Sequence, residues 1–200
     1  MMNFEDFDQA YDWFAPRHEP IPFKEMTRAQ LRQVVKLFKE DQGPRTAYVA
    51  EYLGSTSGKD FPTLSDLEQL LRLGRESLDR TGPQMDDISG TFFSLAIDFA
   101  FCLCTFLQKY RSDVEWAASK TSKKTLTYNR PLIARPDYEA SEGYIDGLQF
   151  FSDSLRSSVR RGKTVDDVMR QLKRSIKRNF DIDFSQRLQA AGGKTHARLQ

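Results

Sequence analysis

Few residues in this chain combine the type and the spacing that catalysis or metal binding requires. Cys102 and Cys104 are two positions apart in an apolar run. On a helix such side chains point about 200° apart, so they can neither share a metal ion nor form a disulfide readily. The two histidines, His18 and His196, lie near opposite ends of the chain, which argues against a zinc site. We therefore expect two small buried thiols, no metal and no cofactor.

The common catalytic motifs are also absent from the sequence, including the nucleophile elbow, the P-loop, the dinucleotide-binding glycine motif and the zinc-protease helix. A Ser-His-Asp arrangement would need His18, which lies in a proline-rich connection, or His196, which lies in the C-terminal tail. Adjacent acids such as Asp166 and Asp167 open a predicted helix, where capping explains them. The sequence thus predicts a protein that is not an enzyme.

Asp98 is the carboxylate that stands out, because it lies in the middle of the most apolar segment. A buried, ionised carboxylate needs a partner, which an Arg or Lys from another helix or from the predicted hairpin could supply. One interpretation is a structural ion pair or a polar stripe that reaches solvent, and the other is a site residue in a pocket. The stripe recurs at steps of three or four and comprises Thr91, Ser94, Asp98, Cys102 and Thr105.

The hydrophobic pattern predicts a mostly α (α+β) protein, a compact bundle of about six helices around a central apolar helix, with a short β-hairpin. Gly43-Pro44 is expected to end the second helix, and Thr46–Leu53 fits a helix or a strand. Val114–Ala118 and Thr125–Tyr128 are the expected hairpin strands. The expected helices are residues 3–15, 27–42, 65–81, 86–110, 141–161 and 164–180, with capping boxes at Thr27 and Ser65 and a cap at Thr164.

The length of 200 residues favours one globular domain, residues 1–184, followed by a flexible tail over 185–200. The acidic N-terminus does not read as a signal peptide. Thr91–Leu107 is at the lower limit for a membrane span and carries Asp98, so we interpret it as a buried core helix. These features predict a soluble cytoplasmic protein.

The formal net charge of +2 conceals a segregation of charge along the chain. Residues 156–200 have a balance of +8, and residues 1–155 have a balance of −6. This pattern fits a solvated helix face, a surface for an acidic partner, or a nucleic-acid site. Nucleic acid is the weakest of these, because no stacking aromatics accompany the charge. The basic face of the last helix comprises Arg170, Lys173, Arg174, Lys177 and Arg178.

Tyr128, Asn129 and Arg130 place an aromatic ring, an amide and a cation on one predicted edge, a composition that protein interfaces favour. Trp116 on the predicted strand fits either the core or an interface. A long apolar helix, Trp116 on a strand, and then Tyr128-Asn129-Arg130-Pro131 resembles the layout of small bacterial immunity-type proteins that are encoded beside secreted toxins. The resemblance covers residues 88–160.

The resemblance implies a cytoplasmic, non-catalytic protein that binds and neutralises a cognate toxin. We expect its partner-binding residues among Trp116, Tyr128, Asn129, Arg130 and Asp98. A toxin with a basic cleft would meet the acidic part of this chain, and one with an acidic surface would meet the last helix. Two alternatives remain, namely a nucleic-acid-associated or regulatory module that uses the basic helix, and an enzyme with a site near Asp98.

Overall fold

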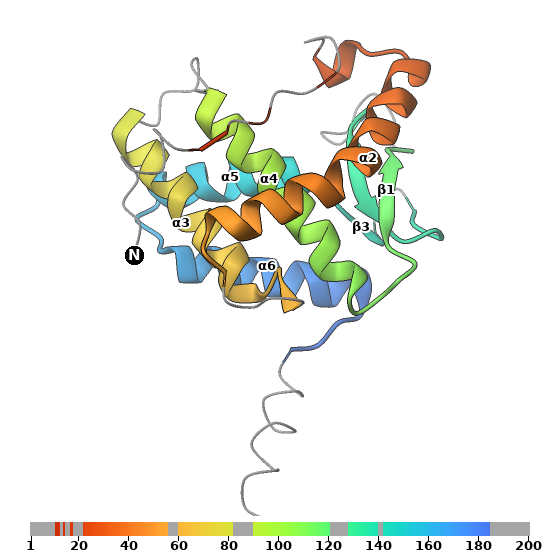
Figure 1. Ribbon diagram of the computed structural model, residues 1–200. Helices are drawn as coiled ribbons and strands as arrows, with labels where there is room; N and C mark the ends of the chain where they lie inside the picture. The colour runs from red at the N-terminus through yellow and green to blue at the C-terminus, as the bar shows by residue number, and fades with distance from the viewer. Residues whose placement is uncertain are drawn as a thin grey trace, which may run out of the picture.

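The computed structural model of the chain is mostly helical, with one small antiparallel sheet (Figure 1). The α+β fold class is therefore confirmed. The described residues form five α-helices rather than six, and most of the expected helix over residues 3–15 lies outside them. The structure describes residues 11, 12, 14, 17, 22–55, 60–81, 90–120, 128–139 and 142–184. The elements are η1 (Phe23–Glu25), α2 (Arg28–Tyr52), α3 (Leu64–Thr81), α4 (Gly90–Gln108), β1 (Glu115–Ala118), β2 (Pro131–Ala134), β3 (Tyr144–Ile145), α5 (Gly147–Arg160) and α6 (Val165–Phe180).

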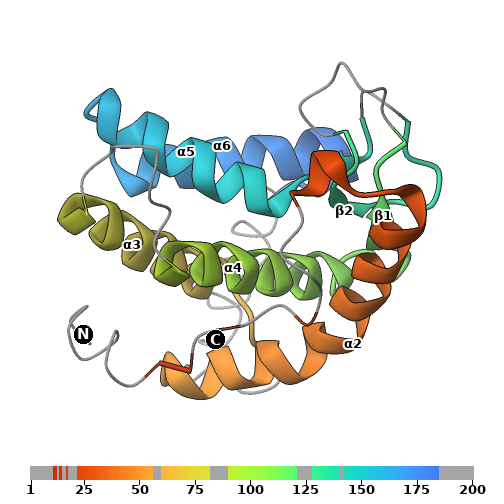
Figure 2. The ribbon, with the colours of Figure 1, turned by 90° about the horizontal axis from the view of Figure 1, so that it is seen from above.

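Helix α4 is the centre of the fold, as its apolar sequence predicts. It packs against α2, α3 and α5, and Figure 2 shows α2 on one side of it and α5 on the other. By length and composition, Thr91–Gln108 could cross a membrane, but most of this segment is buried inside the protein. Such burial is typical of the core helix of a soluble protein. Its fully buried rings include Phe99 and Phe101.

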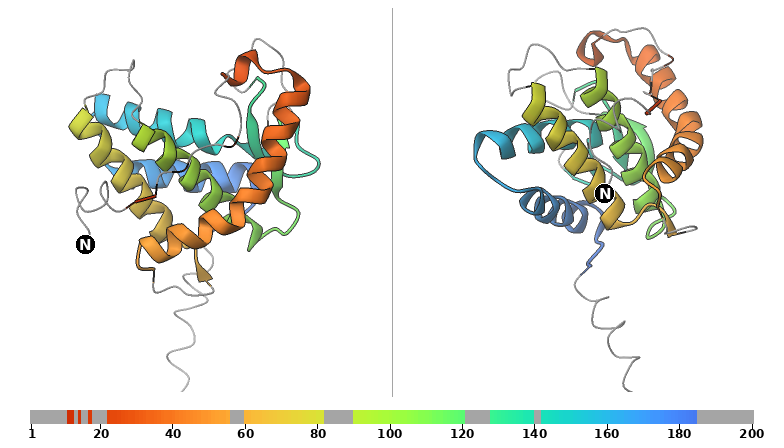
Figure 3. Two further views of the ribbon diagram at one scale, coloured as in Figure 1. Left: turned by 45° about the horizontal axis from the view of Figure 1, so that its top comes forward. Right: turned by 60° about the vertical axis from the view of Figure 1, so that its left-hand side comes forward.

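Helix α2 corrects the prediction that Gly43-Pro44 ends the second helix. It starts at a capping box formed by Thr27 and Gln30, and it continues through Pro44 to Tyr52, so the ambiguous segment after Pro44 is helical. Pro44 has no N–H to donate to the carbonyl of Glu40, a loss that usually costs about 3 kcal/mol. Both residues are exposed, so water can bind that carbonyl. The helix follows a curved path across the protein (Figure 3).

The sheet corrects the expected hairpin. Strand β1 pairs antiparallel with β2, with Trp116 opposite Ile133, and β3 adds to the other edge of β2. Of the expected second strand, residues 125–127 lie outside the described residues and Tyr128 is in a turn. Asn129 has a left-handed backbone with φ of 57°, which ends the turn before β2. Its side-chain amide donates to the carbonyls of Phe23 and Met26, so η1 is fixed beside the sheet.

Helices α3, α5 and α6 begin at side-chain caps. Two of these caps lie at positions that the sequence pattern did not predict. Thr63 and Asp66 cap α3, two residues before the expected capping box at Ser65. Asp146 caps α5, which starts later than Ser141 because Tyr144–Ile145 joins the sheet. A Cβ atom on Gly147 would lie 2.9 Å from Ala100 Cβ, so α5 starts in close contact with α4. The predicted cap of α6 at Thr164 is confirmed.

Candidate functional site

Three of the five predicted partner-binding residues are buried. Asp98, Trp116 and Asn129 are at most 1% exposed, so their side chains cannot contact a partner on the surface of the folded protein. The indole N–H of Trp116 donates to Gln42 Oε1 at 2.8 Å. This arrangement corrects the interface interpretation for these three residues and gives them a role in packing.

Tyr128 and Arg130, the other two predicted partner residues, are half-buried at the turn before β2. The Arg28 guanidinium lies over the Tyr128 ring, 5.3 Å from its centroid. Arg130 forms an ion pair with the buried Asp146 at 2.5 Å. Both side chains therefore link the sheet to neighbouring helices, and the structure does not join them with Trp116 and Asp98 into one exposed surface.

The buried carboxylate of Asp98 is held by an arginine that the sequence did not single out. Arg45 on α2 donates from Nε to Oδ1 at 2.7 Å and from Nη2 to Oδ2 at 3.0 Å, a bidentate pair. The hydroxyl of Tyr11 donates to Oδ2 of the same carboxylate. The two opposite charges thus neutralise each other inside the protein. The guanidinium of Arg45 and the hydroxyl of Tyr11 both donate to the Asp98 carboxylate.

Burial changes the proton affinity of the groups in this cluster. Desolvation raises the pKa of the Asp98 carboxyl, and the hydrogen bonds and charge of Arg45 oppose the increase. Desolvation together with the Asp98 charge raises the pKa of the Tyr11 hydroxyl, so Tyr11 remains a donor at neutral pH. Arg45 is surrounded by aromatic rings, with Tyr48 and Tyr11 at 4.6 Å and 5.1 Å from its guanidinium carbon. The cluster suits a structural ion pair better than an acid–base site, because both carboxylate oxygens of Asp98 accept hydrogen bonds from side chains that bury them.

Four of the described residues before η1, namely Tyr11, Asp12, Phe14 and Arg17, bond to the helices around this ion pair. The Asp12 N–H donates to the Tyr48 hydroxyl at 2.6 Å, and the Phe14 carbonyl accepts from Ser94 Oγ at 3.0 Å. Arg17 pairs with Asp41 at 2.6 Å. We call these four residues the strap: Tyr11 contacts Asp98 directly, and the other three bond to α2 or α4 beside the Arg45–Asp98 pair.

The polar stripe of α4 continues along its contact with α2. Gln42 Nε2 donates to Thr105 Oγ1 at 2.9 Å and to Gln108 Oε1 at 2.8 Å. The Thr46 and Thr105 hydroxyls lie 3.3 Å apart. Gln42, Arg45 and Thr46 follow the spacing of the apolar face of α2, which is the signal that could have identified them. Asp98 and Thr105 of the stripe thus hydrogen bond to α2, and Ser94 hydrogen bonds to the strap.

Cys102 and Cys104 are both fully buried on α4 and are not bonded to each other. Burial raises the pKa of the Cys104 thiol to about 12 and also raises that of Cys102. The nucleophilic thiolate is therefore scarce at neutral pH. Within the described ranges, no three His, Cys, Asp or Glu side chains are close enough to hold a metal ion.

We predict that neither thiol reacts with an aromatic disulfide reagent at pH 8 in the folded protein, because both are protonated and shielded from solvent. Two equivalents should react after denaturation in guanidinium chloride. A native reaction that is complete within minutes would show that the α4 core opens readily.

The predicted basic face of α6 is exposed along the helix. Arg170 pairs with Asp167, and Lys177 pairs with Asp183, which raises the pKa of Lys177. Lys173, Arg174 and Arg178 have no ion pair, hydrogen bond or ring contact through their side chains in the part of the chain that the structure describes. Some cations on other elements, such as those of Arg72 and Arg75, are paired with carboxylates. Three exposed cations without such a partner therefore lie together on α6.

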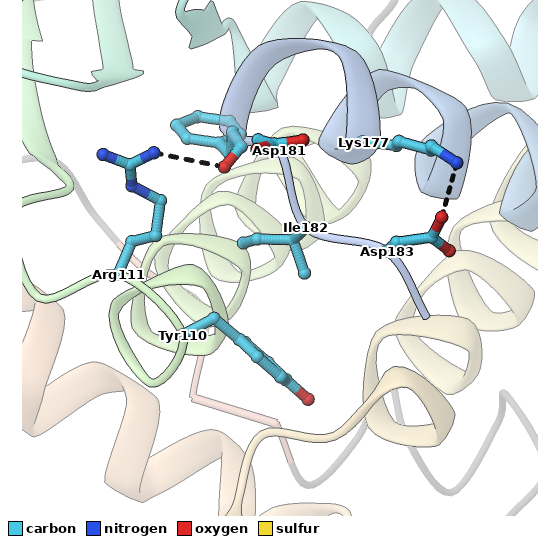
Figure 4. Close-up of a pocket in the computed structure, with 7 residues that line it drawn as sticks. Tyr110, Arg111, Lys177, Asp181, Ile182 and Asp183 are labelled. Atoms are coloured by element: carbon cyan, nitrogen blue, oxygen red, sulfur yellow. Dashed lines mark hydrogen bonds and ion pairs between the residues drawn. The ribbon is translucent and has the colours of Figure 1, made fainter. Parts of the chain in front are cut away.

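A pocket of about 670 Å³ lies at the C-terminal end of this basic face (Figure 4). Tyr110 and Arg111 enter it from the turn after α4, and Lys177 enters it from α6. Arg111 donates to the Phe180 carbonyl at 3.4 Å and pairs with Asp113 at 2.9 Å. The remaining lining residues are Phe180, Asp181, Ile182 and Asp183. The pocket thus joins an aromatic ring and an aliphatic side chain to balanced charges, a composition suited to a side chain of a protein partner.

No protein-family model matches the chain, and neither a curated protein nor a solved structure is similar to it.

Proposed function

We propose that this chain is a non-catalytic binding protein that holds an acidic protein partner on the exposed face of α6 and so inhibits it, as an immunity protein inhibits its toxin. The observation that carries the proposal is the group of three exposed, unpaired cations on α6, namely Lys173, Arg174 and Arg178. An unpaired positive surface attracts an acidic partner over a distance and raises the rate of association.

The backbone of α6 is already held in place in the free protein, before a partner binds. Both ends of the helix are fixed, by the Thr164 capping box and by the left-handed Asp181, and its apolar side is buried in the core. The helix is about 24 Å long at 1.5 Å per residue, a length comparable to a standard protein interface. Binding on this face therefore needs little ordering of the chain, which favours affinity.

Carboxylates at both ends of α6 favour a protein partner over nucleic acid. Asp166 and Asp167 lie in its first turn, and Asp181 and Asp183 follow its last residue. Each would repel the phosphates of a duplex that ran along the helix. A protein surface can place cations opposite these acids and carboxylates opposite the arginines and lysines, and it can insert an apolar side chain beside Tyr110 and Ile182.

We predict that reversal of the three unpaired charges, in the triple variant K173E/R174E/R178E, weakens the complex at least about 100-fold, because like charges would then face each other. The measurement is co-expression of the chain with the product of the adjacent gene, read as cell growth and as co-elution of the two proteins. Wild type should protect the cells, and the triple variant should not.

The matched control is K24E/R32E/K36E, which reverses three exposed cations near the start of the protein. It should protect the cells as wild type does, and both variants should keep the wild-type melting temperature within about 3 °C. If the α6 variant still protects, the surface is wrong, and if wild type neither protects nor binds, the inhibitor function is wrong. A labelled 20-base-pair DNA duplex that is retained at low salt would favour the nucleic-acid alternative.

A further inference from the structure

A second basic surface lies on α5 and its C-terminal cap, and it shares no residue with the face proposed for the partner. Its residues are spaced three or four apart, so they share one side of the helix and line a cleft of about 280 Å³. The lining residues are Asp153, Arg156, Ser157, Arg160 and Arg161. From this cleft we infer a binding site for a compact, phosphate-bearing anion.

The three arginines of the cleft are available to a ligand. The guanidinium groups of Arg160 and Arg161 make no hydrogen bond, ion pair or ring contact in the described ranges. Arg156 lies over the ring of Phe92, with its guanidinium carbon 5.7 Å from the ring centroid. Stacking of this kind fixes the plane of the guanidinium group and leaves its N–H edge free to donate.

The charge of the cleft is not balanced from within. Asp153 is the one carboxylate among the lining residues that the structure describes, and its Oδ2 already accepts from Gln149 Nε2 at 3.0 Å. Three guanidinium groups against one carboxylate leave an excess of two positive charges, and the groups repel one another until an anion enters. The C-terminal end of α5 contributes about −0.5 of a charge, which is smaller than this excess.

The shape and chemistry of the cleft select the class of anion. The guanidinium fork matches phosphate oxygens in a bidentate geometry, and the Ser157 hydroxyl can add a further donor. The volume is just below the range of about 300–1,000 Å³ that is usual for sites of drug-sized ligands. Among the described residues that line the cleft, none is aromatic and able to stack a nucleobase. A diphosphate, or the phosphates of a lipid headgroup, therefore fits better than a nucleotide.

The test is isothermal titration of the full chain with sodium diphosphate at constant ionic strength. We expect the double variant R160Q/R161Q to weaken binding at least about tenfold, because it removes two charge-assisted donors. The matched control is K173Q/R174Q, which removes two adjacent exposed cations from α6. It should change the affinity less than about twofold. This control also separates the two proposals, because K173Q/R174Q alters the proposed partner face and leaves the α5 cleft intact.

A parallel titration with phosphatidylcholine vesicles, with and without 5% phosphatidylinositol bisphosphate, distinguishes the two sources of phosphate. Binding of diphosphate or of the phosphoinositide vesicles that requires Arg160 and Arg161 supports the site, and the probe that binds more tightly identifies the source. Binding of neither probe overturns the inference. Equal losses in R160Q/R161Q and K173Q/R174Q also overturn it, because they would show general attraction to a basic surface.

Discussion

Asp98→Asn should lower the free energy of unfolding by about 3–5 kcal/mol, the largest effect that we expect from a single polar substitution in this protein. The variant keeps the size of the side chain but removes its charge, so Arg45 is left as an uncompensated cation in the interior. Asp12 also pairs with Arg45, at 4.0 Å from Nη1, but its side chain is 83% exposed, so solvent screens this charge and it offsets little of the loss. The measurement is chemical denaturation followed by circular dichroism.

Asp113→Asn is the matched control, since it makes the same chemical change in the exposed pair with Arg111. Exposed pairs contribute less than about 1 kcal/mol, so this variant should unfold almost as wild type does. A double variant, R45M/D98L, should recover most of the stability lost in D98N, because it removes both charges together. If D98N is as stable as D113N, Asp98 is not the structural partner of Arg45, and the alternative of an active site near Asp98 gains support.

Phe101→Ala should lower the free energy of unfolding by about 3–5 kcal/mol, because it leaves a cavity at the centre of the core. The ring is fully buried and lies edge-on against three aromatic residues, with centroid distances of 5.3 Å to Phe38, 5.4 Å to Phe14 and 5.8 Å to Trp116. It therefore joins α2, β1 and the strap. Proteolysis of the strap should also become faster. Chemical denaturation measures the first effect, and the rate of tryptic cleavage measures the second.

Phe93→Ala provides the control on the same helix. The Phe93 side chain is 36% exposed. Phe93→Ala therefore removes the same volume as Phe101→Ala but outside the core, and it should lower the free energy of unfolding by less than about 1 kcal/mol. Similar losses at the two positions would mean that α4 is not the centre of the fold.

The α4 residues of the candidate site could be predicted from the local sequence, but the residues that bond to them from other elements could not. The stripe on α4 follows from residue spacing, and the need of Asp98 for a cation follows from the cost of burying a charge. Arg45 was missed because Gly43-Pro44 reads as the end of a helix. The helix continues because its buried face offsets the loss of one exposed hydrogen bond, and a balance of that kind depends on the other helices.

Local sequence patterns are enough to predict the mostly helical fold, the central apolar helix, the caps at Thr27 and Thr164, and the basic face of the last helix. Each of these depends on neighbours within a few residues, through helical periodicity or local hydrogen bonds. The tertiary structure decided which strand pairs with β1, which residues surround Asp98, and that Trp116 and Asn129 face inward. These depend on residues far apart in the chain, brought together by burial of a shared core, so no local pattern can specify them.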